Sequence, residues 1–168
     1  MGIFDFLSKD PTKTWGDASR RRLTLDLSRG TLNTIKLDDP VERLRLWGKP
    51  DNENAHKDGW FMYKESGLIV GAENKKVQSF GVIVNQCPHY ESFFKADLTI
   101  THLLSGDIPV HGGMLGEHLI DKLNLQVHES DVDDVEIIDY ANIAQYTIEI
   151  ESFADGRIKR VNFYKQLG

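Results

Sequence analysis

The residues best suited to metal or nucleophilic chemistry stand in the middle of the sequence. Cys87-Pro88-His89 offers a thiolate and an imidazole, the usual ligands of zinc, and His102 or His111 would be further ligands. The chain has one cysteine and lacks the paired ligand spacing of a zinc motif. We therefore predict an ordinary loop without a metal site, with metal binding as the alternative.

Two further segments could take part in hydrolysis. His111-Gly112-Gly113 is similar to the oxyanion-hole sequence of esterases, but no Gly-x-Ser-x-Gly nucleophile motif accompanies it. Glu117 and Asp121 would share one helix face beside His118, whereas acid–base catalysis needs carboxylates with different environments in a cleft. A flexible turn and the outer face of an amphipathic helix explain these segments more simply. Because dinucleotide and phosphate-binding glycine motifs are also absent, we predict no catalytic residue and no cofactor.

Acidic residues dominate the second half of the chain. Residues 1–84 contain 14 Lys/Arg and 12 Asp/Glu, whereas residues 85–168 contain 6 Lys/Arg and 14 Asp/Glu. Between Asp97 and Asp155, 13 acidic residues accompany a single basic residue, Lys122. A surface of one sign repels nucleic acid and attracts basic proteins. The sequence therefore predicts a basic protein partner and no binding of nucleic acid.

The segment 129–139 concentrates this charge in what we predict to be an inserted acidic loop. Two strand residues, Glu149 and Glu151, alternate with Ile148 and Ile150 and should project from the opposite face of a sheet. With tyrosines as aromatic anchors, we predict a partner-binding site of Asp131, Asp133, Asp134, Glu136, Asp139, Tyr140, Tyr146, Glu149 and Glu151. The alternatives are a solvated surface that maintains solubility and a calcium loop, although the EF-hand spacing is missing.

An internal repeat organises the elements that must position these residues. Leu23–Gly30 is similar to Leu98–Gly106, about 75 residues later, and each copy reads as a short strand closed by a glycine turn. A helix should follow each copy. The first would begin with Asp39 as N-cap and Pro40 as first helical residue, and the second would span residues 115–124.

Strands then close each copy of the repeat. The first copy has strands at 60–63, 67–70 and 77–84 with a hairpin signal at Asn74-Lys75, and its aromatic residues Trp60, Phe61 and Tyr63 should divide between core and surface. The second has strands at 146–152 and 158–164, joined at Asp155-Gly156. The sequence therefore predicts an α+β fold of two related β-α-β-β units, each an antiparallel sheet with a packed helix. The predicted boundaries are an N-terminal arm (1–22), a first unit (23–86) and a second unit (87–168) within one compact domain, and whether the sheets merge stays open.

This order of elements resembles the β-lactamase-inhibitor-protein-like fold. The resemblance rests on the strand, the short helix ending in Gly-Lys-Pro-Asp (48–51), Tyr63, Gly67-Leu68 and the closing hairpin, and its layout covers residues 23–165. In that fold, two α/β units lie side by side and their combined sheet offers a surface to a protein partner. The resemblance implies a protein-binding role and assigns no individual site residue.

Composition agrees with a globular binding module. The chain has 168 residues, 40% hydrophobic and 27% charged, which suits about one domain. Its single cysteine excludes an internal disulfide, and no apolar run approaches the roughly 18 residues of a membrane span. We predict a cytoplasmic bacterial protein that binds a protein partner and contacts no membrane. The more specific form of this prediction is an immunity or inhibitor protein that neutralises a basic toxin or enzyme.

Two other classes of function stay open at this point. One is a small hydrolase or metal-dependent enzyme that would use His111, His118, Glu117 and Cys87. The other is a structural protein that forms a homodimer through an edge strand.

Overall fold

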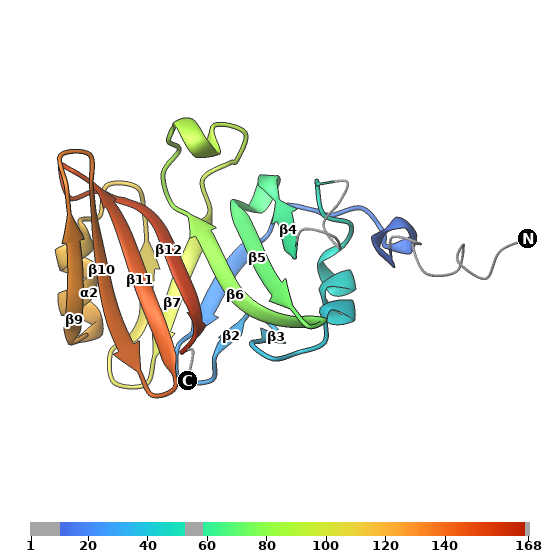
Figure 1. The fold of residues 1–168 in the computed structure, drawn as a ribbon, viewed down its shortest axis with the longest axis horizontal. Coiled ribbons are helices and arrows are strands. Elements are labelled where there is room, and N and C mark those ends of the chain that lie inside the picture. Colours follow the sequence, from blue (N-terminus) through green and yellow to red (C-terminus); the bar gives the residue numbers. More distant parts are fainter. Residues whose placement is uncertain (1–10, 53–58, 167–168) are drawn as a thin grey trace, which may run out of the picture.

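Two β-sheets pack against each other in the computed structural model, which describes residues 11–52 and 59–166 (Figure 1). The five-stranded sheet has the order β3 (Ile35–Lys36), β2 (Thr31–Leu32), β1 (Arg22–Asp26), β7 (Asp97–His102) and β8 (Gly106–Val110). The seven-stranded sheet has the order β4 (Trp60–Tyr63), β5 (Leu68–Glu73), β6 (Lys76–Ile83), β12 (Ile158–Lys165), β11 (Tyr146–Phe153), β10 (Glu136–Ile143) and β9 (Val127–Val132). The fold is therefore mostly β, with few helices. Of the predicted N-terminal arm, residues 1–10 lie outside the described residues.

The two similar segments of the sequence pair with each other. In the parallel pair β1–β7, Leu23 lies opposite Leu98. In the antiparallel pair β6–β12, Phe80 lies opposite Phe163. Each sheet thus contains strands from both halves of the chain, so the sheets of the two predicted units merge. Among the strand pairs of the described residues, β1–β7 alone is parallel, which departs from the expected antiparallel sheets.

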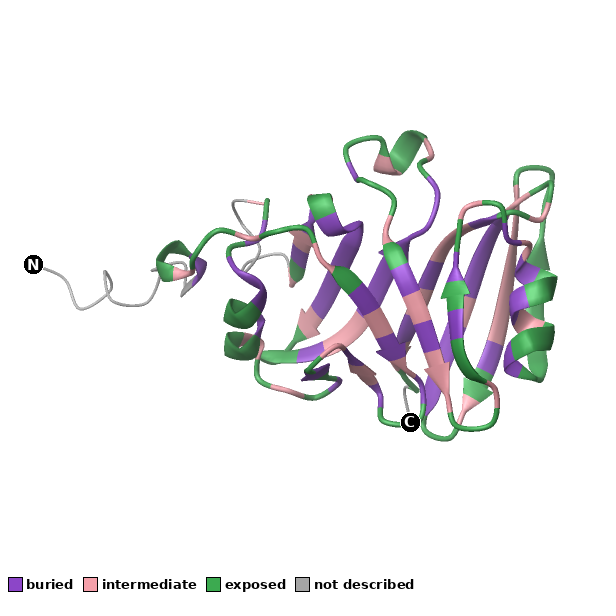
Figure 2. Cartoon of the chain, turned by 180° about the vertical axis from the view of Figure 1, so that it is seen from behind, coloured by how far each residue is buried: buried purple, intermediate pink, exposed green. Residues whose placement is uncertain are grey.

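The core forms where the inner faces of the two sheets meet. Burial alternates along β1, where Leu23 and Leu25 are buried and Thr24 between them is half-buried. Figure 2 shows buried positions alternating with half-buried or exposed ones along several strands. Phe80 and Phe163 belong to the same core and are both fully buried. Each such side chain contributes about 1.5–3 kcal/mol to folding.

The two predicted helices form, but they differ in kind. α2 (Gly116–Leu123) lies within the predicted range and buries Leu119 and Leu123. The other is the 3₁₀ helix η3 (Val41–Trp47), whose buried Leu44 and Trp47 share one face because a 3₁₀ helix repeats every three residues. No helix in the described part of the chain is long and apolar enough to cross a membrane.

The predicted N-cap of the first helix is wrong. Pro40 occupies the cap position, and no side chain caps the helix. The Asp39 carboxylate instead accepts a hydrogen bond from the Lys36 N–H at 2.9 Å. Asp39 thus stabilises the turn before the helix, which is a common alternative use of a short acidic side chain.

The segment 129–139 is not the acidic loop that the sequence predicts. β9 and β10 form an antiparallel hairpin at the end of the seven-stranded sheet, with Asp131 opposite Ile138. The turn lies at residues 133–135, where one Asp133 oxygen accepts hydrogen bonds from the N–H groups of Val135 and Glu136, each 2.8 Å long. These bonds hold the pKa of Asp133 below its ordinary value. The pattern concealed the strand because all six residues of β9 are exposed, which leaves no apolar alternation.

Candidate functional site

The outer face of the seven-stranded sheet is the candidate site. The five-stranded sheet and α2 lie on its other side (Figure 1). Strand register sets the outward side chains of this face in three rows. The first row is Asp131, Ile138, Glu151, Arg160 and Ile83; the second is Glu129, Tyr140, Glu149, Asn162, Gly81, Ile69 and Met62; the third is Asn142, Thr147, Tyr164, Ser79, Gly71 and Trp60.

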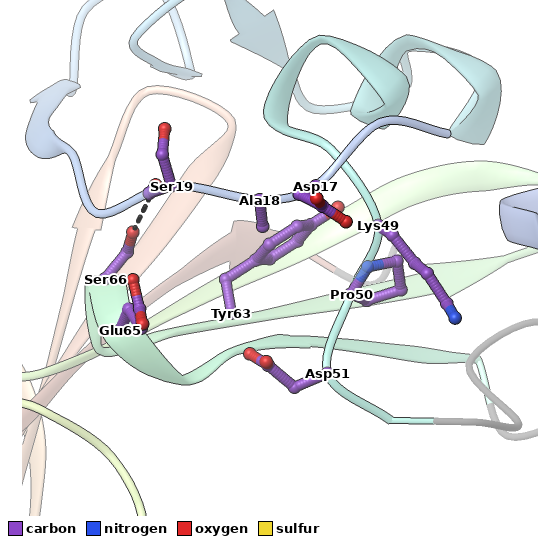
Figure 3. A pocket seen from close by; sticks show the side chains of 9 residues that line it. All are labelled: Asp17, Ala18, Ser19, Lys49, Pro50, Asp51, Tyr63, Glu65 and Ser66. Atoms are coloured by element: carbon purple, nitrogen blue, oxygen red, sulfur yellow. Dashed lines mark hydrogen bonds between the residues drawn. The ribbon is translucent and has the colours of Figure 1, made fainter. Parts of the chain in front are cut away.

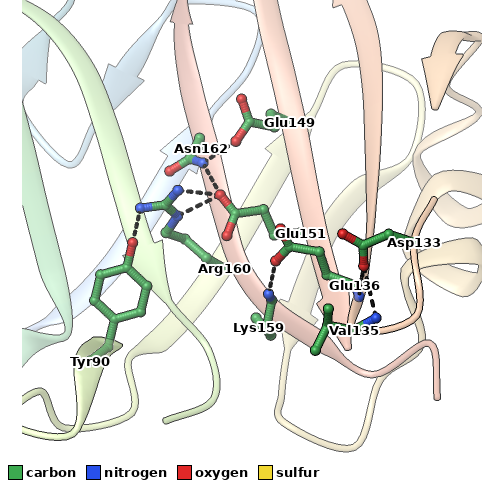
Figure 4. A network of polar contacts seen from close by, with 9 residues as sticks. All are labelled: Tyr90, Asp133, Val135, Glu136, Glu149, Glu151, Lys159, Arg160 and Asn162. Carbon is green, nitrogen blue, oxygen red and sulfur yellow. Dashed lines mark hydrogen bonds and ion pairs between the residues drawn. The ribbon is translucent and has the colours of Figure 1, made fainter. Parts of the chain in front are cut away.

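A polar network occupies the middle of this outer face (Figure 4). One Glu151 oxygen accepts hydrogen bonds from Arg160 Nε at 2.9 Å and from Asn162 Nδ2 at 3.0 Å, and Arg160 Nη2 also contacts it. Arg160 donates a further hydrogen bond to the Tyr90 hydroxyl, which belongs to the 3₁₀ helix η5 (Pro88–Tyr90). Only 9% of the Glu151 side chain is exposed. The network therefore compensates a nearly buried carboxylate with charge-assisted hydrogen bonds.

Glu149 is the second carboxylate of the network and has a different environment. It accepts hydrogen bonds from Asn162 and, at 3.3 Å, from the Tyr164 hydroxyl, both of which are neutral donors. Burial, together with the neighbouring Glu151, raises the pKa of Glu149 above its ordinary value. Burial and the charge of Glu149 raise the pKa of Tyr164 to about 12. Tyr164 is therefore a neutral donor at physiological pH.

A hollow of about 230 Å³ lies beside the network and is lined by Gly81, a strand position that carries no side chain. A Cβ on Gly81 would lie 2.9 Å from Asn162 Oδ1, and a Cβ on Gly71 would lie 3.1 Å from the Trp60 ring. Trp60, 49% exposed, and Tyr164 border the hollow. Tryptophan and tyrosine are the side chains that most often dominate protein interfaces, and their ring faces attract cations.

One flank of the outer face is covered by the loop that follows β6. Phe93 packs with Ile69 and Ile83 into a small second hydrophobic cluster, and Tyr90 contacts its edge. The Phe93 and Tyr90 rings meet edge to face, with centroids 6.0 Å apart. Beyond this loop, Trp60 at the hollow and Glu129 and Asp131 at the acidic end of the face are exposed.

The structure divides the nine predicted partner-binding residues among several places. Asp131, Tyr140, Glu149 and Glu151 project from the outer face, as the rows above show. Of these four residues, Glu151 is nearly buried and forms an ion pair with Arg160. Asp133 and Asp134 lie at the exposed turn of the β9–β10 hairpin. Glu136 is half-buried and bound to Lys159.

The last two of the predicted residues face inward. Asp139 accepts a hydrogen bond from Ser130 Oγ at 2.6 Å and lines a hollow beside Glu117 at the start of α2. Tyr146 is only 4% exposed and packs against Phe163, with ring centroids 5.1 Å apart. Its predicted role as a surface anchor is wrong, because along β11 it shares the inward face with Ile148.

The residues suggested for metal binding or hydrolysis do not come together. Among residues 11–52 and 59–166, no three His, Cys, Asp or Glu side chains lie close enough to hold a metal ion. His118 and Glu117 form an exposed contact of 3.8 Å on α2. The Gly112 carbonyl accepts a hydrogen bond from the buried Asn85 side chain at 2.7 Å, so this glycine pair belongs to an anchored turn.

A larger hollow, about 380 Å³, lies where the N-terminal segment crosses β4 and the 3₁₀ helix η4 (Lys64–Ser66), as Figure 3 shows. Its polar groups join these elements to each other. Ser66 Oγ donates to the Ser19 carbonyl at 3.5 Å, and the Tyr63 hydroxyl donates to the Gly48 carbonyl at 3.4 Å. Burial raises the pKa of this Tyr63 hydroxyl. We interpret this hollow as a seam between elements.

A solved structure has a similar fold. No family model matches the sequence, and no curated protein matches it either. The structure is similar to the crystal structure of a DUF4309 family protein, YjgB, from Bacillus subtilis, with a TM-score of 0.52 and 11% sequence identity over 80% of this chain and 84% of that chain. At this identity, the similarity shows the fold alone.

Proposed function

We propose that this chain is a non-catalytic protein-binding module whose outer sheet face docks a basic protein. One observation carries the proposal: Tyr140 and Tyr164 lie beside Glu149, and Trp60 borders the same hollow, on a face that the other sheet of the described residues leaves uncovered. Aromatic anchors give affinity at the centre of an interface, and charge of one sign selects the partner and speeds association. Of the acidic residues that the sequence suggests for docking, Asp131 lies at the end of this face, and Asp133 and Asp134 follow at the hairpin turn.

The network prepares the face for a cationic partner. Arg160 pairs directly with Glu151, whereas the side chains of the described residues that donate hydrogen bonds to Glu149 are the neutral Asn162 and Tyr164. A lysine or arginine of the partner would supply the charged hydrogen-bond donor that Glu149 lacks. Because the network already holds these side chains in place, little rotamer freedom would be lost on binding.

The dimensions of the face suit a stable interface. Seven strands spaced about 4.8 Å apart give a width of roughly 29 Å. Strands of eight residues, such as β11, are about 27 Å long. A face of this size approaches the roughly 800 Å² that each partner buries in a standard interface.

In its sharper form, the proposal is an immunity or inhibitor protein that neutralises a basic toxin or enzyme in the bacterial cytoplasm. Neutralisation requires tight and rapid association rather than turnover, and an acidic face raises the association rate. The resemblance to the β-lactamase-inhibitor-protein-like fold also implies docking through a combined sheet. We further propose that the chain consists of two related β-α-β-β units, since segments 75 residues apart pair in register as β1 and β7.

Capture from native lysate with matched charge variants tests this proposal. Glu129→Lys changes the outer face and Glu117→Lys changes α2 on the other side, with the same change in net charge. We expect the chain to capture one basic protein at about 50 mM salt. Capture should weaken at about 300 mM salt, because the Debye length falls from roughly 14 Å to roughly 6 Å. Glu129→Lys and Trp60→Ala should abolish capture, whereas Glu117→Lys should retain it. Equal capture by all variants would contradict docking on this face.

A further inference from the structure

We propose that β9 binds an extended, basic segment of the partner by pairing with it as an eighth strand of the sheet. This inference rests on the proposed function and adds the mode of docking. β9 is the end strand of the seven-stranded sheet, and all six of its residues are exposed. An end strand presents a row of unpaired N–H and C=O groups, which an extended peptide can complete.

The hydrogen bonds of the hairpin show which backbone groups of β9 are free. The Asp133 N–H donates to the Glu136 carbonyl at 3.0 Å, so this opposed pair is hydrogen-bonded. Because bonded and non-bonded pairs alternate in an antiparallel ladder, Asp131 and Ile138 form the next bonded pair. The N–H and C=O groups of Ser130 and Val132 therefore point away from β10 toward the open edge. Within the described part of the chain, these groups make no backbone hydrogen bond outside the sheet.

The strand at the other end of the same sheet is closed. Asn52 Oδ1 accepts a hydrogen bond from the Met62 N–H and Asn52 Nδ2 donates to the Trp60 carbonyl, both at 2.9 Å. The Asp51 N–H also donates to the Met62 carbonyl at 2.7 Å. Residues 51–52 thus occupy the edge of β4, which leaves β9 as the open edge of this sheet among the described residues.

Charge selects the occupant of that edge. Glu129 and Asp131 project from β9 on the outer face, Asp133 and Asp134 follow at the turn, and residues 127–139 contain no Lys or Arg. A second copy of the chain would bring like charges opposite each other, which destabilises paired strands. An incoming strand with Lys or Arg at alternate positions would instead face Glu129 and Asp131.

Apolar contacts would fix one end of the added strand. Val132 is 70% exposed at the end of β9, and Val135 is 72% exposed in the turn. Exposed valines beside an open edge offer apolar surface to a neighbouring strand. The fitting partner segment is therefore extended, with basic residues at alternate positions and an apolar residue near the turn.

A proline substitution separates backbone pairing from charge attraction. Ser130→Pro removes an outward N–H without removing a hydrogen bond to β10, and Ser130→Ala is the matched control that also loses the bond to Asp139 but keeps the N–H. The probe is a peptide of about ten alternating lysine and threonine residues, titrated at low salt and followed by calorimetry and by the amide signals of β9. We expect Ser130→Pro to weaken binding by about tenfold and Ser130→Ala to change it by less than about twofold.

A second probe keeps the test decisive if Ser130→Pro does not fold. The same peptide with every second backbone nitrogen methylated has equal charge but cannot complete the ladder, and we expect it not to shift the β9 amides. Equal binding of the methylated peptide, or of Ser130→Pro, would overturn strand pairing. If sedimentation showed a dimer and Ser130→Pro abolished it, the edge would belong to a second copy of the chain. That result would also overturn pairing with a basic partner segment. Loss of partner capture in Trp60→Ala with normal capture by Ser130→Pro would retain the docking face and reject the edge.

Discussion

Glu149 and Glu151 lie two residues apart on one strand but differ in what compensates their charge. Arg160 contacts Glu151 through two nitrogens, whereas Glu149 receives hydrogen bonds from the neutral groups of Asn162 and Tyr164. Burial therefore raises the pKa of Glu149. The folded protein binds a proton at this site more tightly than the unfolded chain does, which makes stability depend on pH.

Glu149→Gln should stabilise the protein at pH 8 and have little effect at pH 4. Folding raises the pKa of Glu149 above its ordinary value of 4.5. The free energy of unfolding therefore falls as the pH increases from 4.5 through the raised pKa, because the folded protein must then hold a buried negative charge. Glutamine stays neutral, so the variant does not lose this stability. Urea unfolding at the two pH values measures the difference, with Glu117→Gln as an exposed control on α2. The same stabilisation at both pH values, or in the control, would show that desolvation of Glu149 is not the cause.

Arg160→Met should destabilise the protein by about 2–4 kcal/mol, because it leaves Glu151 nearly buried without a cation. Arg160→Met combined with Glu151→Met should recover most of this loss, since apolar residues of similar size often replace a buried ion pair at little cost. A double-mutant cycle by denaturant unfolding measures the coupling. Additive losses would mean that the two side chains act independently.

The same residues show how far the sequence could predict the site. Alternation along the strand predicts that Glu149 and Glu151 project from one face of the sheet and Ile148 and Ile150 from the other. The structure confirms this arrangement. The same alternation puts Tyr146 on the face of Ile148 and Ile150, and the structure buries it there. The contact between Arg160 and Tyr90 joins residues 70 positions apart and has no local signal.

At the scale of elements, the Asn74-Lys75 turn was predictable and the acidic edge strand was not. The Asn74-Lys75 hairpin signal is confirmed, since these residues have φ values of 51° and 62° between β5 and β6. β9 escaped prediction because hydrophobic alternation arises only where one face of a strand is buried. The wrong N-cap at Asp39 has a similar reason, because a short acidic side chain also serves turns.

Lys75→Gly should stabilise the β5–β6 hairpin by about 0.5 kcal/mol. Glycine adopts the left-handed conformation without the strain of a Cβ, and Asn-Gly is the preferred pair for this turn, although glycine also gives the unfolded chain more freedom. Lys76→Gly is the matched control, because this residue lies within β6, where glycine should destabilise by about 0.5–1 kcal/mol. Thermal and urea unfolding of both variants check the opposite signs. Destabilisation by Lys75→Gly would show that the lysine side chain outweighs the backbone effect.

For the whole molecule, the sequence predicted two similar halves but not how they share their sheets. Periodicity identifies strands, whereas it carries no information about which distant strand each one pairs with. β1 pairs with β7 and β6 pairs with β12, so each half supplies an interior neighbour for the other. The repeat therefore predicted the elements better than it predicted the boundary between independent units.

Fragments 1–86 and 87–168, produced separately, should each fail to unfold cooperatively. Alone, the first fragment would expose the edges of β1 and β6, and the second fragment would expose the edges of β7 and β12. Phe80 and Phe163 would also lose each other as cross-strand neighbours. An equimolar mixture should regain the fold, aided by charge, because the first fragment has 14 basic and 12 acidic residues and the second 6 and 14. Near-ultraviolet circular dichroism and amide spectra compare the fragments with their mixture. A cooperative transition in either fragment alone would show that a half can fold without its neighbour, and the shared sheets would then be a docking of two domains rather than one folding unit.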